Sequence, residues 1–225
     1  MELLVHDSPE TVAEAVADRI AGLIAEADDR FSLGLSGGTT PEDTYRALWA
    51  RAPRWDRVDA WLSDERWVPP DHERSNGALV ARALFDDADV SFDRPRWSEF
   101  LTPADSAAHY EARLRHIHRE SGPDLVLLGM GEDGHTASLF PGTPALQVQD
   151  RWYVANPVPQ LGEQRLTATF PLLWGARLLM VLVVGVGKAQ AVRSSFEKAT
   201  PAGLLGEGGA EVEWHVDRDA ASLIA

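Results

Sequence analysis

Cysteine is absent from the 225 residues of this chain. Disulfide bonds, thiolate metal sites and cysteine nucleophiles are therefore all excluded. Lysine is also scarce, because Lys188 and Lys198 are the only two lysines among 21 basic residues. Since every other basic residue is an arginine, the two lysines are easy to examine individually.

Positive charge is in short supply as well. The chain has 35 acidic residues against 21 basic ones, which gives a formal net charge of −14. Binding to the phosphate backbone of a nucleic acid needs a basic face, so we expect no nucleic-acid partner. A local cationic pocket is still compatible with an acidic surface.

Long hydrophobic runs are missing too. The most apolar stretch, residues 178–186, is about half of the ~20 residues that a transmembrane helix needs. It is instead typical of a buried strand. Residues 1–7 have neither the basic start nor the apolar segment of a secretory signal. These features predict a cytoplasmic protein with no membrane partner.

Short apolar runs alternate with segments of helical periodicity along the chain. This alternation is typical of a parallel sheet with crossover helices. We therefore expect a single three-layer α/β/α domain over residues 1–225, with a mainly parallel, Rossmann-like sheet. The glycine-rich stretch 203–209 predicts a mobile surface turn. The expected strands are 3–5, 31–35, 58–62, 124–129, 152–155, 166–170, 178–184 and 212–215, and the expected helices begin near Pro9, Thr40, Ser75, Pro103 and Lys188.

A glycine-rich turn lies between the strand that ends at Leu35 and the helix that begins near Thr40. Gly37 and Gly38 let the backbone turn sharply and approach a ligand closely. Exposed amides there, followed by Thr39 and the positive end of a helix, favour an anion such as phosphate. The alternative is an ordinary tight turn, and this segment alone does not separate the two. It is not a P-loop, because Gly-Lys-Ser/Thr is absent.

A second glycine loop, residues 131–136, follows the predicted strand at 125–129. His135 in this loop can act as a general base, because histidine has an unperturbed pKa of roughly 6.5. Asp133 can hold the imidazole or the attacking water. The alternative is a histidine that merely caps a turn, but its place between glycines at a strand end favours catalysis. The glycine spacing is a weak dinucleotide fingerprint, because no second βαβ unit with a ribose-binding acid follows.

Four more charged candidates lie at the ends of predicted strands. Asp64 can accept hydrogen bonds from a polyol, and Arg66 can pair with an anionic group. Arg165 and Lys188 each place one cation at the edge of a strand. Together with a glycine turn, two cations make a phosphate site. Taken singly, each of these charges is more often a solvated surface residue.

No spacing of histidines and acids matches a zinc, calcium or iron site, and we expect no metal or other cofactor. His116 and His118 are two residues apart on a predicted helix, so they point in different directions. His6, His109 and His215 are interpreted as incidental. The eight tryptophans are scattered and are assigned to packing.

In combination, these segments resemble the 6-phosphogluconolactonase family. The resemblance runs in the family's order from about residue 33 to residue 190. It rests on Leu-Ser-Gly-Gly-Thr-Thr-Pro at 35–41, Ser-Asp-Glu-Arg-Trp-Val-Pro at 63–69 with His72, Ser75 and Asn76, and Gly-Met-Gly-Glu-Asp-Gly-His-Thr-Ala-Ser-Leu-Phe-Pro-Gly at 129–142. Arg-Leu-Thr at 165–167 and Gly-Val-Gly-Lys-Ala at 185–189 complete it.

The resemblance implies an α/β/α fold related to glucosamine-6-phosphate isomerases. It also implies hydrolysis of 6-phospho-D-glucono-1,5-lactone to 6-phosphogluconate in the pentose phosphate pathway. The family's proposed catalytic histidine falls on His135 and its motif aspartate on Asp133. The family's phosphate-binding elements fall on Gly37, Gly38, Thr39, Arg165 and Lys188, and its substrate-contacting acid and arginine on Asp64 and Arg66.

The isomerase and deaminase branch of the same superfamily is the closest alternative, because it shares the Gly-Glu-Asp-Gly-His segment. In that branch an asparagine and a glutamate follow the histidine, and the glutamate works with it in ring opening. Here those positions read Leu139 and Phe140. Apolar side chains cannot move protons, so the resemblance favours the lactonase branch.

An alternative of another class is a non-catalytic sugar-phosphate sensor on the same fold, which would not need His135 and Asp133. The expected partner is a small sugar phosphate lactone, and the expected assembly is a monomer or a weak homo-oligomer. The residues leave open whether Arg66 or the backbone amides of 131–135 stabilise the oxyanion.

Overall fold

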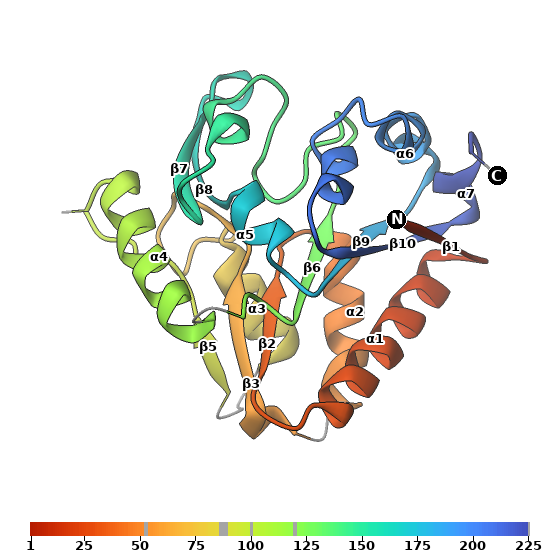
Figure 1. The fold of residues 1–225 in the computed structure, drawn as a ribbon, viewed down its shortest axis with the longest axis horizontal. Coiled ribbons are helices and arrows are strands. Elements are labelled where there is room, and N and C mark those ends of the chain that lie inside the picture. Colours follow the sequence, from red (N-terminus) through yellow and green to blue (C-terminus); the bar gives the residue numbers. More distant parts are fainter. Residues whose placement is uncertain (52–53, 86–89, 100, 119–120, 225) are drawn as a thin grey trace.

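A seven-stranded, all-parallel sheet lies at the centre of the computed structural model, which describes residues 1–51, 54–85, 90–99, 101–118 and 121–224 (Figure 1). The expected α/β class with a mainly parallel sheet is therefore confirmed. In spatial order the strands are β1 (Glu2–His6), β10 (Glu211–Asp217), β9 (Leu178–Val183), β6 (Leu125–Gly129), β2 (Phe31–Leu35), β3 (Val58–Leu62) and β5 (Ser91–Asp93).

Helices cover both faces of this sheet. One face packs against α1 (Pro9–Glu26), α2 (Thr39–Trp49) and α3 (Asn76–Leu84). The other packs against α4 (Pro103–His118), α6 (Ala189–Phe196) and α7 (Arg218–Ala221). In Figure 1, α1 and α2 lie side by side on the lower right and α4 lies on the far left. Shorter helices are α5 (Phe170–Trp174) and the 3-10 turns η1 (Trp55–Arg57), η2 (Pro144–Gln147), η3 (Pro159–Leu161), η4 (Val186–Lys188) and η5 (Ala202–Glu207).

Strands β6 and β9, in the middle of the sheet, lack polar side chains because both of their faces are buried. In β6, Leu125 and Leu127 pack into the core beneath α1, α2 and α3. Val126 and Leu128 pack into the core on the opposite face. Successive side chains of β6 point to opposite faces, and both faces are buried. The sequence therefore shows a continuous apolar run there instead of alternating apolar and polar residues. None of the helices among the described residues is long and apolar enough to span a membrane.

A second, smaller sheet is antiparallel and consists of β4 (Asp64–Arg66), β8 (Glu163–Ala168) and β7 (Tyr153–Val158). Figure 1 shows β7 and β8 at the upper left, beyond α5. The strands expected at 152–155 and 166–170 exist in this sheet with shifted bounds. We did not expect β4, whose register places Arg66 directly opposite Arg165.

The prediction of a surface turn at 203–209 is wrong for most of that stretch. Residues 202–207 form η5, and Gly203 and Leu205 within it are buried. A Cβ on Gly203 would lie 2.3 Å from the backbone oxygen of Ser195. Glycine is therefore present here because it permits close packing, a use that composition alone does not distinguish from a flexible turn.

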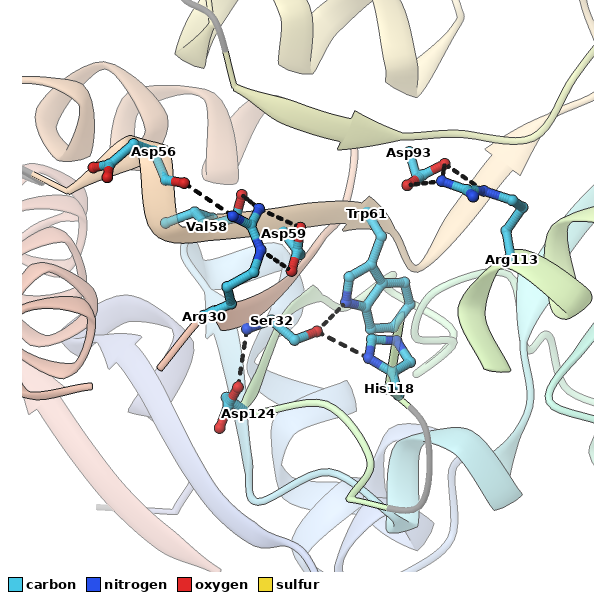
Figure 2. Close-up of polar contacts among 10 residues, drawn as sticks. All are labelled: Arg30, Ser32, Asp56, Val58, Asp59, Trp61, Asp93, Arg113, His118 and Asp124. Atoms are coloured by element: carbon cyan, nitrogen blue, oxygen red, sulfur yellow. Dashed lines mark hydrogen bonds and ion pairs between the residues drawn. The ribbon is translucent and has the colours of Figure 1, made fainter. Parts of the chain in front are cut away.

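A buried polar cluster lies near the amino end of β2, where Ser32 forms polar contacts with three side chains (Figure 2). Its hydroxyl lies 3.1 Å from Nδ1 of His118 and accepts a hydrogen bond from the indole of Trp61 at 3.1 Å. Its backbone N–H donates to Asp124 at 2.9 Å. Burial lowers the pKa of His118 to about 4. The imidazole is consequently neutral in the folded protein at neutral pH.

This burial predicts a pH dependence of stability. Between pH 6.5 and pH 4 the unfolded chain binds a proton at His118 that the folded chain does not bind, so stability falls as the pH falls through this window. We expect His118→Gln to reduce the loss of unfolding free energy between pH 7 and pH 4 by about 3 kcal/mol. Urea titrations at each pH measure this difference.

His116→Gln is the matched control, because His116 is exposed on the same helix. It should leave the pH dependence as it is in the wild type. An equal pH dependence in the wild type and in His118→Gln would contradict the prediction.

Candidate active site

A cavity of about 570 Å³ opens at the carboxyl ends of β2, β6 and β9. In open parallel sheets this edge is where ligands bind. Its walls come from the turns that follow these three strands and from β4 and β8 of the small sheet. All nine residues expected in the site line it: Gly37, Gly38, Thr39, Asp64, Arg66, Asp133, His135, Arg165 and Lys188.

A short hydrogen bond joins the two residues expected to do the chemistry. Nδ1 of His135 lies 2.6 Å from Oδ1 of Asp133, and the same oxygen accepts the backbone N–H of His135 at 3.1 Å. Burial by itself raises the pKa of Asp133. The nearby imidazole and these hydrogen bonds lower it by more than burial raises it, so the pKa lies below its usual value. An ionised carboxylate can only accept, so Nδ1 carries the proton in this hydrogen bond, and Nε2 holds the lone pair whenever the imidazole is neutral.

The loop around His135 is tightly built. Gly131 donates its N–H to the carbonyl of His135 at 2.9 Å and accepts from the N–H of Gly134 at 3.0 Å. A Cβ on Gly131 would lie 2.2 Å from the imidazole, so no larger residue fits beneath the ring. The aromatic ring of Phe140 stacks on the imidazole with 3.9 Å between the centroids. These contacts hold the imidazole in one place at the pocket wall.

Asp64 lies at the pocket but is 5% exposed. Its Oδ2 accepts from the hydroxyl of Ser138 at 2.6 Å, and its Oδ1 accepts from Nδ2 of Asn76 at 3.1 Å. Asn76 is itself held by Glu65, which accepts its backbone N–H at 2.7 Å. Burial raises the pKa of Glu65 in spite of its hydrogen bonds. Asp64 therefore links β4 to the segment that follows His135.

The glycine turn that precedes α2 uses both glycines for a sharp turn and a close approach, as expected. Gly38 has φ +111°, in the region that favours glycine. A Cβ on Gly37 would lie 1.8 Å from Oδ1 of Asn76, so this glycine permits a close approach. Within the described part of the chain, the N–H groups of Gly37 and Gly38 have no hydrogen-bond partner. Two backbone donors thus line the cavity next to Thr39.

Two arginines meet on the small sheet. Arg165 is 8% exposed and pairs with Glu163 at 2.7 Å, and Glu163 also pairs with Arg74. Burial, and then the charge of Arg66, lower the pKa of Arg165. Arg66 donates to the carbonyl of Arg74 at 2.7 Å. The Nε atoms of Arg66 and Arg165 are buried without a partner among the described residues. Two like charges held this close favour an anionic ligand.

Lys188 completes the cationic wall from the turn after β9. Among the residues that the structure describes, it forms no ion pair, so its charge is available to the cavity. The turn is held by Asp217, whose two carboxylate oxygens each lie 3.0 Å from the N–H of Gly185. Asp217 also caps α7 by accepting from the N–H of Ala220 at 2.8 Å. Because Asp217 is the last residue of β10, the position of Lys188 depends on the carboxyl end of this strand, which neighbours β9.

Sequence reasoning did not place Asn76, Ser138 or Phe140 in the site. Each lay inside a segment that carried the family resemblance, but nothing in its residue type pointed to a role. Their importance comes from contacts between segments far apart in the chain, such as the Ser138–Asp64 bond. The sequence shows neither these contacts nor the burial of Asp64.

The fold and the pocket together define an α/β protein with a small-molecule site at the edge of its parallel sheet. The chain belongs to the family of glucosamine-6-phosphate isomerases and 6-phosphogluconolactonases, which matches residues 7–214. The resemblance found in the sequence is thereby confirmed.

Relatives with curated names are similar over most of the chain. A 6-phosphogluconolactonase of Nostoc sp. is 37% identical over 87% of this chain and 85% of its own length. One from Rhizobium meliloti is 38% identical over 88% and 90%. The solved structure of 6-phosphogluconolactonase from Trypanosoma brucei superimposes with a TM-score of 0.89, at 26% identity, over 100% of this chain and 98% of that one.

The close approach at Gly37 leads to a prediction about stability. In Gly37→Ala the new methyl group would overlap Oδ1 of Asn76, and the displaced amide would leave Oδ1 of Asp64 without its donor. We expect a loss of about 1–3 kcal/mol in the free energy of unfolding, measured by urea denaturation.

Gly22→Ala serves as the control, because Gly22 lies exposed in α1 with nothing within 4 Å of its Cβ position. This change should stabilise the protein slightly, since alanine is the better helix former. A Gly37→Ala protein as stable as the wild type would show that the contact with Asn76 is not as described.

Proposed function

We propose that this chain hydrolyses 6-phospho-D-glucono-1,5-lactone to 6-phospho-D-gluconate in the oxidative branch of the pentose phosphate pathway. The observation that carries the proposal is the placement of the Asp133–His135 pair in the same cavity as Arg165 and Lys188. The names of the similar proteins support the same activity. Such a site brings a base to one end of a small phosphorylated ester and cations to the other.

The phosphate of the substrate binds to the cationic wall and the glycine turn. Arg165 and Lys188 supply positive charge, and the N–H groups of Gly37 and Gly38 supply donors of the kind that bind phosphate oxygens. Thr39 adds its hydroxyl. Anchoring this end fixes the lactone carbonyl near His135 and gives the attack a large advantage in orientation.

His135 acts as the general base. Its Nε2 takes a proton from a water molecule while the water oxygen attacks C1 of the lactone. The bond from C1 to the ring oxygen then breaks, and the imidazolium returns the proton to that departing oxygen. Asp133 stays ionised throughout and stabilises the imidazolium through the hydrogen bond at Nδ1. The products are a free hydroxyl and a carboxylic acid, which ionises at neutral pH by releasing its proton to solvent, so no other reactant is needed.

We propose that Arg66 stabilises the oxyanion, rather than the backbone amides of residues 131–135. Three of the five backbone N–H groups of 131–135, those of Gly131, Gly134 and His135, already donate within the loop. Arg66 uses one terminal nitrogen for the carbonyl of Arg74, and its other terminal nitrogen makes no hydrogen bond among the described residues. Asp64, which lines the same cavity, contacts the hydroxyl groups of the sugar.

The isomerase alternative is disfavoured by what surrounds the imidazole. Leu139 is fully buried, and the ring of Phe140 stacks on His135 where a second proton-transfer group would be needed. The sensor alternative does not account for the short Asp133–His135 bond, which binding alone does not require.

The nine site residues line one cavity within a single copy of the chain, and we propose a monomer or a weak homo-oligomer built on one domain. The cytoplasm is the proposed location, because a phosphorylated lactone carries charges that do not cross a bilayer unaided.

The activity is tested with freshly made 6-phosphogluconolactone in an assay coupled to the appearance of 6-phosphogluconate. Spontaneous hydrolysis, measured without protein, is subtracted. We expect protein-dependent hydrolysis and no release of ammonia from glucosamine 6-phosphate. Ammonia release without lactone hydrolysis would overturn the proposal in favour of the deaminase branch.

The role of His135 predicts a large effect on turnover. We expect His135→Gln to lower kcat by about 10²–10⁴-fold, the usual contribution of a general base, while 6-phosphogluconate still binds. His109→Gln, which changes an exposed histidine on α4, is the control and should keep the wild-type kcat. Full turnover in His135→Gln would refute the role of this imidazole.

A further inference from the structure

The aromatic ring of Phe140 contacts two functional groups of the site. Its centroid lies 3.9 Å from that of the His135 imidazole, and the planes of the two rings are 23° apart. The guanidinium carbon of Arg165 lies 6.0 Å from the same centroid. Phe140 is 5% exposed and lines the cavity, so its ring is almost wholly buried at the pocket wall. A flat apolar side chain therefore joins the histidine and a cation of the pocket.

We infer that Phe140 is a positioning residue that sets the plane of the catalytic imidazole, an inference that rests on the proposed lactone hydrolysis. The hydrogen bond from Nδ1 to Asp133 fixes one end of the imidazole but leaves the ring able to rock about that bond. Contact with the flat face of Phe140, and the close approach of Gly131, remove this freedom. Nε2 is thereby aimed at one point in the cavity.

The stack also acts on charge during the reaction. When Nε2 takes the proton from water, positive charge spreads over the imidazole. The face of a phenyl ring carries negative partial charge, so it attracts a cation stacked on it. Leucine fills a similar space but has no such face. Phe140 therefore favours the protonated imidazole that forms at the moment of attack.

The test compares four variants in the lactonase assay. Phe140→Leu and Phe140→Met remove the aromatic face and should lower kcat about tenfold while KM stays within twofold of the wild type. Phe140→Tyr restores a ring and should recover most of the lost kcat. Phe170→Leu is the matched control, because Phe170 is 3% exposed and stacks on Trp174 at 4.9 Å. It should lose stability but keep kcat.

Melting temperatures establish that each variant is folded, and proton NMR reports the stack directly. In the wild type the ring current of Phe140 should move the carbon-bound protons of His135 upfield, and Phe140→Leu should abolish this shift. An unchanged kcat in Phe140→Leu, or an equal loss in Phe140→Tyr and Phe140→Leu, would overturn the inference and leave the proposed function standing. A wild-type protein without lactonase activity would overturn both.

Discussion

The hydrogen bond between Asp133 and His135 is the interaction on which the rest of the site depends. It orients the imidazole, decides which nitrogen carries the proton, and in the proposed reaction would provide a negative charge for the imidazolium. The loop is shaped around it: Gly131 leaves room for the ring, and Phe140 covers the face of the imidazole. The fold contributes by ending β6 at this point, so that the loop begins at the rim of the sheet.

The cationic part of the site has a different origin. The large parallel sheet provides the turns that carry the glycine donors and Lys188, but the two arginines come from a separate antiparallel sheet. Pairing of β4 with β8 places Arg66 and Arg165 opposite each other, an arrangement that is unfavourable without an anion. Glu163 offsets part of this repulsion through its ion pair with Arg165. Binding of a phosphate would relieve the rest.

Much of this could be read from the sequence, for physical reasons. The strands at 125–129 and 178–183 are buried on both faces, so their apolar runs are easily recognised in the sequence, and the carboxyl ends of such strands locate the cavity. The small antiparallel sheet is harder to predict from the sequence, because β4 has only three residues, all of them charged, and exists only through its pairing with β8. The contacts of Asn76, Ser138 and Phe140 join distant segments, and no local pattern encodes them. The glycine-rich stretch at 203–209 was predicted to be a surface turn because composition alone does not show that Gly203 is buried against the backbone of Ser195.

The pairing of β4 with β8 also limits how a chain of this kind can vary in length. Side chains along a strand alternate between its two faces, so inserting or deleting one residue within β8 would turn Arg165 away from the cavity. The turn at 159–162, which joins β7 to β8, is under no such restriction. Length differences that arise by insertion should therefore accumulate at that turn and at the outer loops, whereas the number of residues from Glu163 to Ala168 is fixed by the register of β8 with β4.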